Sequence, residues 1–145
     1  DQGPIPRRAR RPVGCNSVPN TPRLISIVDD DHSVRRALHR LVQYAGFTAE
    51  TFASAEDFLS SASLVRTACL VLDIHLKGGM SGFELQAQLT ADRVVIPIIF
   101  ISAHSDLLTR ERAEKSGAVA YLWKPFNDEL LLDAIRGVVG GAAID

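Results

Sequence analysis

Five polar residues stand where short hydrophobic segments end, and they are Asp29, Asp30, Asp73, Ser102 and Lys124. The hydrophobic segments before them are 24–28, 69–72, 96–101 and 119–123. Short apolar segments rich in β-branched and aromatic residues are typical of strands buried on both faces of a parallel sheet. Such sheets bind ligands beyond the carboxyl ends of their strands. The sequence therefore predicts that three carboxylates, a hydroxyl and an ammonium meet in one pocket.

The three aspartates of this set predict a cation site. Neighbouring carboxylates raise one another's pKa, so a pocket that holds Asp29, Asp30 and Asp73 attracts a cation. Hard oxygen ligands favour Mg²⁺, which commonly binds through one or two carboxylates together with phosphate oxygens. An alternative is that Asp30 or Asp31 only caps the helix that follows, since acidic residues suit helix N-termini. A cap leaves the neighbouring acids unexplained, so we assign the capping role to Asp31.

Strand and helix patterns alternate five times from Leu24 onward and could position these residues. The expected strands are 24–28, 47–52, 69–72, 96–101 and 119–123, of which 47–52 is weaker and edge-like. The helical patterns that follow them cover 34–45, 55–62, a stretch from about 82, 106–115 and 126–138. Strict alternation with short connections implies right-handed crossovers and a parallel sheet covered on both sides. We therefore predict a doubly wound α/β fold.

Local signals at the helix ends add detail to this prediction. Ser54 is expected to cap the short helix that follows it, with Asp57 at the spacing of a capping box. Gly140-Gly141 is expected to end the last helix, because glycine favours the position after a helix. The residues of that helix expected to face inward recur every four positions, and they are Phe126, Leu130, Ala134 and Val138.

Length and composition fit one globular domain with a charged N-terminal arm. The 145 residues carry a net charge of −1, and no apolar stretch approaches the roughly 20 residues of a membrane span. Residues 1–23 hold five of the seven prolines, and their five arginines against one aspartate give +4. We interpret them as a flexible Arg- and Pro-rich arm. The remainder has 11 Lys and Arg against 16 Asp and Glu, a poor match for a nucleic-acid-binding surface.

The two cysteines lie in different surroundings and have no CxxC spacing. Cys69 opens an apolar run and is expected to be a small core residue, whereas Cys15 lies in the proline-rich arm. We expect no disulfide framework, and a reducing, cytoplasmic compartment is the simplest location. The arm also lacks the apolar region of a secretory signal.

Four motifs occur in a fixed order, each at the end of an expected strand. They are Ile27-Val-Asp-Asp-Asp31, Leu72-Asp-Ile-His-Leu76 with Met80-Ser-Gly-Phe-Glu84 behind it, Ile101-Ser-Ala103, and Trp123-Lys-Pro-Phe126. This order resembles the receiver domains of bacterial two-component response regulators, the CheY-like superfamily. The resemblance covers residues 24–139 and leaves 140–145 as a C-terminal tail. It implies a flavodoxin-like (βα)5 sheet with strand order 2-1-3-4-5, whose switch point lies between the first and third strands.

The resemblance also implies a role for each site residue. Asp73 is the expected phosphoryl acceptor, which would form an aspartyl phosphate. Asp30 and Asp73 would ligate Mg²⁺ directly, His75 through its main-chain carbonyl and Asp29 mainly through water. Lys124 would contact the phosphoryl group, because phosphoryl transfer depends on cations near the equatorial oxygens.

Ser102 and Tyr121 are the expected switch residues. By resemblance, the Ser102 hydroxyl donates to the attached phosphoryl group, and Tyr121 turns into the space that Ser102 vacates. Such a change is a population shift between two packings. The alternatives are that Ser102 caps the following helix and that Tyr121 is an ordinary strand aromatic.

The loop after Asp73 departs from the pattern of the family. Members often have proline four residues after the acceptor and glycine eight residues after it. In this chain the residue four after Asp73 is Lys77, and the glycine, Gly82, stands nine residues after Asp73. The loop is therefore expected to be one residue longer, and Gly78-Gly79 can absorb the insertion since glycine readily adopts a positive φ. Donor access and hydrolysis rate are the properties that this change affects.

The resemblance implies a signalling receiver rather than an enzyme with an external substrate. It would take a phosphoryl group from a sensor histidine kinase or phosphotransfer protein and catalyse only its own phosphorylation and dephosphorylation. One alternative is a phosphatase with an aspartate nucleophile, although such enzymes typically carry a second acid where this chain has His75. The other is the receiver fragment of a DNA-binding transcription regulator. The downstream protein target and a phosphorylation-dependent homodimer stay open, and neither nucleic acid nor membrane is expected as a partner of this domain.

Overall fold

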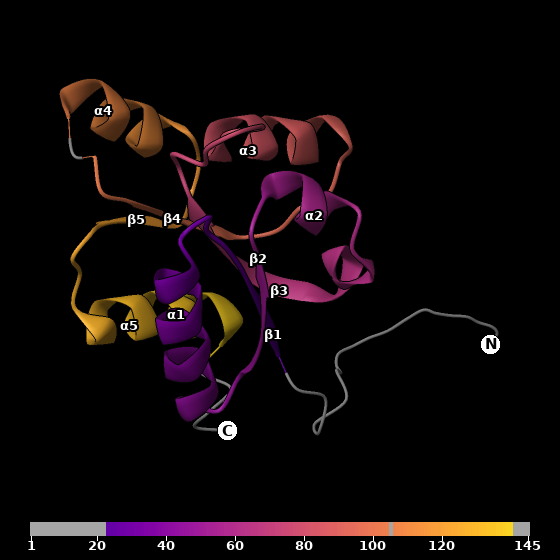
Figure 1. Cartoon of the computed structure of the whole chain (residues 1–145), viewed down its shortest axis with the longest axis vertical. Helices are drawn as coiled ribbons and strands as arrows, with labels where there is room; N and C mark the ends of the chain where they lie inside the picture. Colours follow the sequence, from indigo (N-terminus) through magenta and orange to yellow (C-terminus); the bar gives the residue numbers. More distant parts are fainter. Residues whose placement is uncertain (1–22, 105, 141–145) are drawn as a thin grey trace, which may run out of the picture.

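The computed structural model describes residues 23–104 and 106–140. It contains one five-stranded parallel sheet in the order β2-β1-β3-β4-β5, which confirms the expected fold and strand order (Figure 1). The strands are β1 Leu24–Val28, β2 Thr48–Phe52, β3 Thr67–Asp73, β4 Ile98–Ser102 and β5 Ala120–Trp123. The helices are α1 His32–Tyr44, α2 Ala55–Leu59, α3 Gly82–Ala91, α4 Leu107–Lys115 and α5 Asp128–Val139, with a 3₁₀ helix η1 at Ala62–Arg66.

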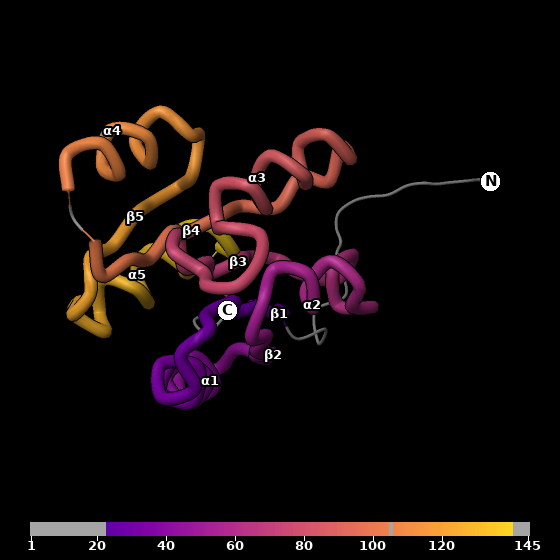
Figure 2. The backbone as a smooth tube through the Cα atoms, turned by 45° about the horizontal axis from the view of Figure 1, so that its top comes forward, coloured from indigo at the N-terminus to yellow at the C-terminus, as the bar shows by residue number. Residues whose placement is uncertain are grey.

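Helices cover both faces of the sheet, as the near-continuous apolar strands require. α1 and α5 lie on one face, and α2, α3 and α4 lie on the other (Figures 1 and 2). Within β1, Ile25 and Ile27 point toward α1 and α5, while Val28 packs with the helices of the opposite face. The alternation of side chains along each strand therefore divides the hydrophobic core into two layers.

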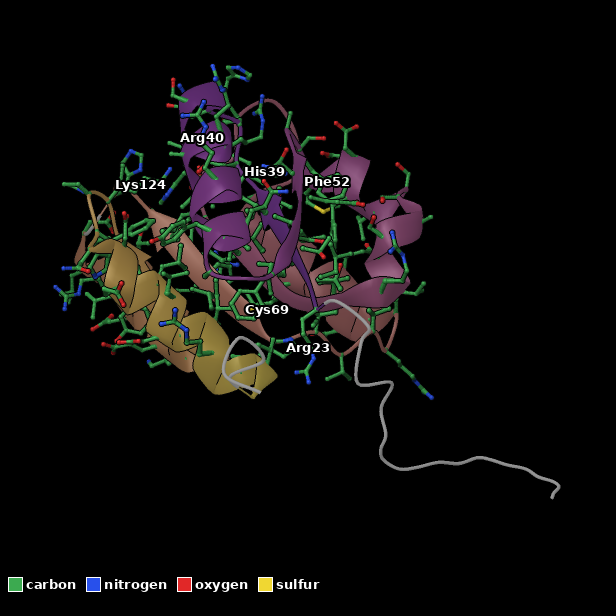
Figure 3. All side chains as sticks on the ribbon, turned by 90° about the horizontal axis from the view of Figure 1, so that it is seen from below. Arg23, His39, Arg40, Phe52, Cys69 and Lys124 are labelled. Atoms are coloured by element: carbon green, nitrogen blue, oxygen red, sulfur yellow. The ribbon has the colours of Figure 1, made fainter. Side chains whose placement is uncertain are left out.

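Residues just outside the sheet connect the two ends of the described chain. The guanidinium of Arg23, which the sequence assigned to the arm, donates to the carbonyl of Val139 in the last turn of α5. Figure 3 shows Arg23 at the opposite end of the domain from Lys124. The predictions for residues 1–22, including Cys15, and for the tail residues 141–145 lie outside the described residues. Within the described ranges, no helix is long and apolar enough to span a membrane.

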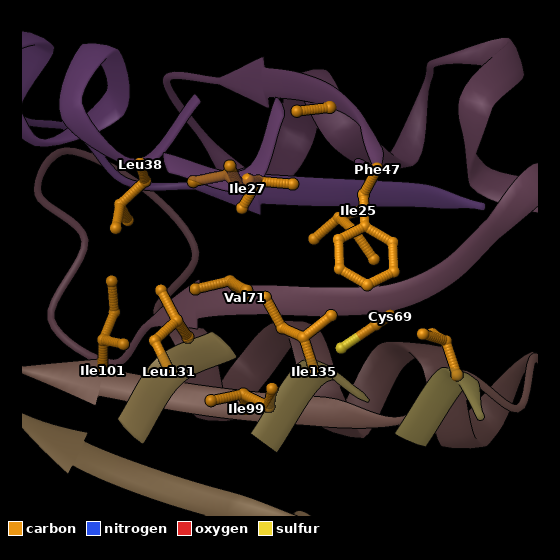
Figure 4. Packing of buried hydrophobic residues seen from close by; sticks show 13 residues of the cluster. Ile25, Ile27, Leu38, Phe47, Cys69, Val71, Ile99, Ile101, Leu131 and Ile135 are labelled. Carbon is orange, nitrogen blue, oxygen red and sulfur yellow. The ribbon is translucent and has the colours of Figure 1, made fainter. Parts of the chain in front are cut away.

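The layer beneath α1 and α5 is made mainly of aliphatic side chains, with the ring of Phe47 and the sulfur of Cys69 among them (Figure 4). Val71 and Ile99 from the central strands have no exposed surface, and Ile135 of α5 packs against them. Cys69 is fully buried in the same layer, as expected, and this burial raises the pKa of its thiol to about 12. Each such aliphatic side chain contributes about 1.5–3 kcal/mol by leaving water, which fixes the strands that carry the site.

The helix N-termini are capped by side chains close in sequence. Asp31 accepts from the amides of Ser33 and Val34 at the start of α1, which confirms its capping role. Ser54 caps α2 as expected, by accepting from the amide of Asp57 at 3.0 Å. Each cap satisfies backbone donors that have no partner within the helix.

The expected boundaries differ slightly from those observed, and one residue of the predicted helix face was wrong. β3 begins at Thr67 and includes Asp73, whereas β4 begins at Ile98, two residues later than expected. In α5, Leu130 is 54% exposed, so the prediction that it faces inward was wrong. Phe126, Ala134 and Val138 do pack against the core. The helix starts only at Asp128, however, and its buried residues were not among those predicted. They are Leu131, Leu132, Ile135 and Val139.

Candidate functional site

The candidate site lies at the carboxyl ends of β1 and β3, neighbouring strands at the switch point of the sheet. Asp29 follows β1 directly and is fully buried, Asp30 is half-buried, and Asp73 ends β3 with 5% of its surface exposed. One carboxylate oxygen from each of the three lies within 4.8 Å of the other two. The structure therefore brings together the three acids that the sequence placed in one pocket. Their hard oxygen ligands suit Mg²⁺.

Lys124 supplies positive charge to this acid cluster. Its Nζ donates to Asp29 Oδ2 at 2.8 Å and lies 3.6 Å from Asp73 Oδ2. The lysine follows β5, and its amide donates to the carbonyl of Ser102 at 2.7 Å, which extends the pairing of β5 with β4 to this residue. Burial alone would lower the pKa of Lys124, but the hydrogen bond that it donates to Asp29 and the charge of Asp73 outweigh burial and raise that pKa.

Asp73 is a buried acid surrounded by opposing influences. Burial and the negative charge of Asp29 raise its pKa to about 6, while Lys124 and a hydrogen bond from the His75 amide act in the other direction. That amide donates to Asp73 Oδ1 at 3.0 Å. At neutral pH Asp73 is therefore mainly ionised, as a nucleophile or metal ligand must be.

This raised pKa predicts that the metal-free protein is less stable at neutral than at mildly acidic pH. The pKa of Asp73 is about 6 in the folded protein and near 3.8 when unperturbed, so between these values the folded state holds the proton that the unfolded chain has released. The free energy of unfolding should fall as pH rises through this window, by about 3 kcal/mol from this group alone. Urea denaturation of the wild type and of Asp73→Asn, in chelator from pH 4 to pH 7, isolates the contribution. A difference between the two proteins that stays constant with pH would contradict it.

Ser102 ends β4 and is fully buried. Its Oγ accepts from the His104 amide at 2.9 Å and lies 3.1 Å from Nδ1 of His75, whose ring packs against the His104 ring at 4.3 Å between centroids. Burial and the nearby His104 lower the pKa of His75. The alternative that Ser102 caps α4 was wrong, because Asp106 caps that helix by accepting from the Thr109 amide.

Tyr121 lies on β5 and points toward α4. Its hydroxyl donates to Glu114 Oε2 at 2.7 Å, and its ring packs against Trp123 with centroids 5.7 Å apart. The guanidinium of Arg110 lies 5.8 Å from the Trp123 ring, so α4 and β5 share one aromatic and charged layer here. In this structure Tyr121 is therefore held by α4.

The loop between β3 and α3 packs closely against the site. The amide of Gly82 donates to the carbonyl of Ile74 at 2.9 Å, and a Cβ at position 82 would lie 2.5 Å from the carbonyl oxygen of Asp73. No larger residue fits there without moving the backbone at the end of β3. The amide of Lys77 donates to Asp30 Oδ2 at 2.8 Å, so the loop also contacts the acid cluster directly.

Three contacts of the site were missed from the sequence. They are the His75–Ser102 pair, the bond that the Met80 amide of the β3–α3 loop donates to Glu56, and the bond that Arg35 of α1 donates to the Asp29 carbonyl. A signal existed for the first: His75 and His104 each stand two residues after a site residue at the end of neighbouring strands. The sequence has no comparable signal for the other two.

A flavodoxin-like parallel sheet with three aspartates and a lysine at its switch point defines the class of receiver domains. The family model described as "Response regulator receiver domain" matches residues 25–136. The chain belongs to this family and is a receiver domain of a two-component response regulator, a signalling protein.

Known proteins similar to this chain agree with that assignment. Nodulation protein W of Bradyrhizobium diazoefficiens is 42% identical over 125 residues, which cover 86% of this chain and 55% of the relative. The transcriptional regulatory protein FixJ of Rhizobium meliloti is 38% identical over 112 residues, 77% of this chain and 54% of the relative. The solved structure of response regulator StyR has a TM-score of 0.75 and 46% identity, covering 86% of this chain and 62% of that one. The chain thus spans about half the length of the curated relatives that it matches.

Proposed function

We propose that Asp73 accepts a phosphoryl group with the help of Mg²⁺ bound at the acid cluster. The observation that carries this proposal is the position of Lys124, whose ammonium lies between the buried Asp29 and Asp73 at the switch point. An ammonium held there is available to a phosphoryl group on Asp73. By family resemblance, Asp30 and Asp73 hold the metal directly, His75 through its carbonyl and Asp29 through water.

In the transfer step, a carboxylate oxygen of Asp73 forms the new bond to phosphorus while the bond from phosphorus to the donor breaks. A histidine kinase or phosphotransfer protein would present phosphohistidine, and the leaving imidazole keeps the electron pair of the broken bond. Bound Mg²⁺ would stabilise negative charge on the equatorial oxygens. Lys124 would contact the same phosphoryl group through its ammonium, which lies 3.6 Å from Asp73 Oδ2. Since the transfer needs positioning more than covalent help, the rigid strand ends supply most of what the protein contributes.

The switch would follow from contacts that the phosphoryl group makes with Ser102. The hydroxyl of Ser102 would donate to a phosphoryl oxygen, which changes its present bonding with His75 and His104. Tyr121 would then leave Glu114 and turn inward, altering the surface of α4, β5 and α5. Phosphorylation favours this state only through its differential contacts with the two packings.

We further propose that the chain has three segments. Residues 24–139 form the receiver, 1–23 an arm and 140–145 a tail. The receiver catalyses only its own phosphorylation and dephosphorylation. We also propose that it serves as the receiver part of a transcription regulator, since FixJ is a transcriptional regulatory protein of about twice the matched length.

Intact-mass measurement after incubation with Mg²⁺ and acetyl phosphate tests the proposal. We expect one added phosphoryl group per chain, and none when a chelator removes the metal. A protein that stays unmodified with Mg²⁺ present would contradict the assignment. Many turnovers of a generic phosphate ester, with release of phosphate, would instead support the phosphatase alternative.

A further inference from the structure

The carboxylate of Glu56, in the first turn of α2, holds the loop between β3 and α3. Its Oε2 accepts from the amide of Met80 at 2.9 Å. This bond joins residues 24 positions apart and is the largest cause of a lowered pKa of Glu56, because it favours the ionised carboxylate. A loop that contacts the acid cluster is thus anchored on a neighbouring helix.

The backbone of the loop is fitted around this carboxylate. A Cβ at Gly79 would lie 2.8 Å from Oε2 of Glu56, closer than Cβ atoms come to another heavy atom, and 3.1 Å from Oε1, tighter than most Cβ contacts. A larger residue at position 79 would therefore displace the carboxylate from this place. The close approach at Gly79 and the bond from the Met80 amide both put the Glu56 carboxylate against the loop backbone.

The other side of the same loop contacts the acid cluster. The Lys77 amide donates to Asp30 Oδ2 at 2.8 Å, a bond that the proline common at this place in the family could not make. Only Gly78 and Gly79 separate Lys77 from Met80, and Gly78 has a φ of +75°. Two glycines in sequence have large conformational freedom, so this segment needs an anchor to keep one geometry.

We propose that Glu56 is a positioning residue for the cation site. Glu56 holds the Met80 amide, and Met80 is joined through the two glycines to Lys77. The Lys77 amide therefore stays bonded to Asp30 and holds the Asp30 carboxylate in place beside Asp29 and Asp73. The inference rests on the proposed function, in which Asp30 is a metal ligand. The direct partner of this carboxylate is the Lys77 amide, and loss of such a partner typically changes metal affinity 10–100-fold.

Titration calorimetry with Mg²⁺ alone on the full chain tests this role. We expect Glu56→Ala to weaken Mg²⁺ binding about tenfold. Glu56→Gln keeps an oxygen acceptor for the Met80 amide without the charge and should stay within about threefold of the wild type. Asp57→Asn, which removes a charge from the next position of the same helix, is the matched control and should bind like the wild type. Equal losses in Glu56→Gln and Glu56→Ala would assign the effect to charge and overturn the positioning role.

A second measurement needs no metal. In the metal-free protein, hydrogen exchange at the Lys77 amide should accelerate at least severalfold in Glu56→Ala but not in Glu56→Gln or Asp57→Asn. Wild-type protein that binds no Mg²⁺ would contradict the proposed function itself. A different result would overturn the positioning role alone: the wild type binds Mg²⁺, and Glu56→Ala has the same Mg²⁺ affinity and the same Lys77 exchange rate as the wild type. Thermal unfolding of each variant checks that the fold is retained.

Discussion

Replacing the acceptor carboxylate, Asp73→Asn, is expected to abolish phosphorylation by acetyl phosphate. The amide of asparagine carries no negative charge and is a very poor nucleophile, so no bond to phosphorus forms at this position. Asp73 is buried beside the Lys124 ammonium at 3.6 Å, and it shares its pocket with Asp29 and Asp30. Intact mass after incubation with Mg²⁺ and acetyl phosphate measures the loss.

Asp31→Asn provides a matched control for this experiment. Asp31 belongs to the same run of acids but caps α1, with its Oδ1 2.8 Å from the Ser33 amide. Asparagine is about as good a cap as aspartate, so phosphorylation and folding should both persist in this variant. Labelling that survives in Asp73→Asn, or that disappears in Asp31→Asn, would show that the acceptor has been assigned to the wrong acid.

Lys124→Met should produce the largest loss of stability among single changes at the site. The lysine side chain is 20% exposed, and its partners Asp29 and Asp73 are 0% and 7% exposed. Removal of one partner from a buried ion pair leaves an uncompensated charge and typically destabilises a protein by several kcal/mol. We expect the free energy of unfolding at neutral pH, without Mg²⁺, to fall by about 4 kcal/mol.

Urea denaturation of Lys124→Met and of a surface control, Lys115→Met, measures this effect. Lys115 is exposed in the last turn of α4, so its replacement should change stability by no more than about 0.5 kcal/mol. Saturating Mg²⁺ should recover part of the loss in Lys124→Met, since a bound cation again neutralises the acids. Equal stability of the two variants would mean that the ammonium does not compensate the buried carboxylates.

The strands and the order of the site residues were predictable because their signals are local. A short, mainly apolar segment rich in β-branched residues, such as Leu24–Val28, is typical of a strand covered on both faces. A polar residue that follows such a segment lies at the carboxyl end of a strand, and this located Asp29, Asp73 and Lys124. The caps Asp31 and Ser54 were also predictable, because a cap bonds to an amide two or three residues away.

The face of α5 shows where local signals were insufficient. Apolar residues recur every four positions in two registers, one through Leu130 and Ala134 and one through Leu131 and Ile135. Either register makes an amphipathic helix, so the pattern alone does not choose between them. In the structure Leu131 and Ile135 are fully buried and Leu130 is exposed, while the smaller Ala134 packs at the margin of the same layer.

The sequence by itself determined the kind of fold, the family, and which acids and which lysine meet at the switch point. Only the tertiary structure decided which atoms pair: Lys124 with Asp29 across 95 positions, His75 with Ser102 across 27, and Glu56 with Met80 across 24. Strand formation and capping depend on residues close together in the chain, so local sequence patterns predict them. A hydrogen bond between groups far apart in the chain depends on the register of the sheet and the path of a loop, and the spacing of residues predicts neither.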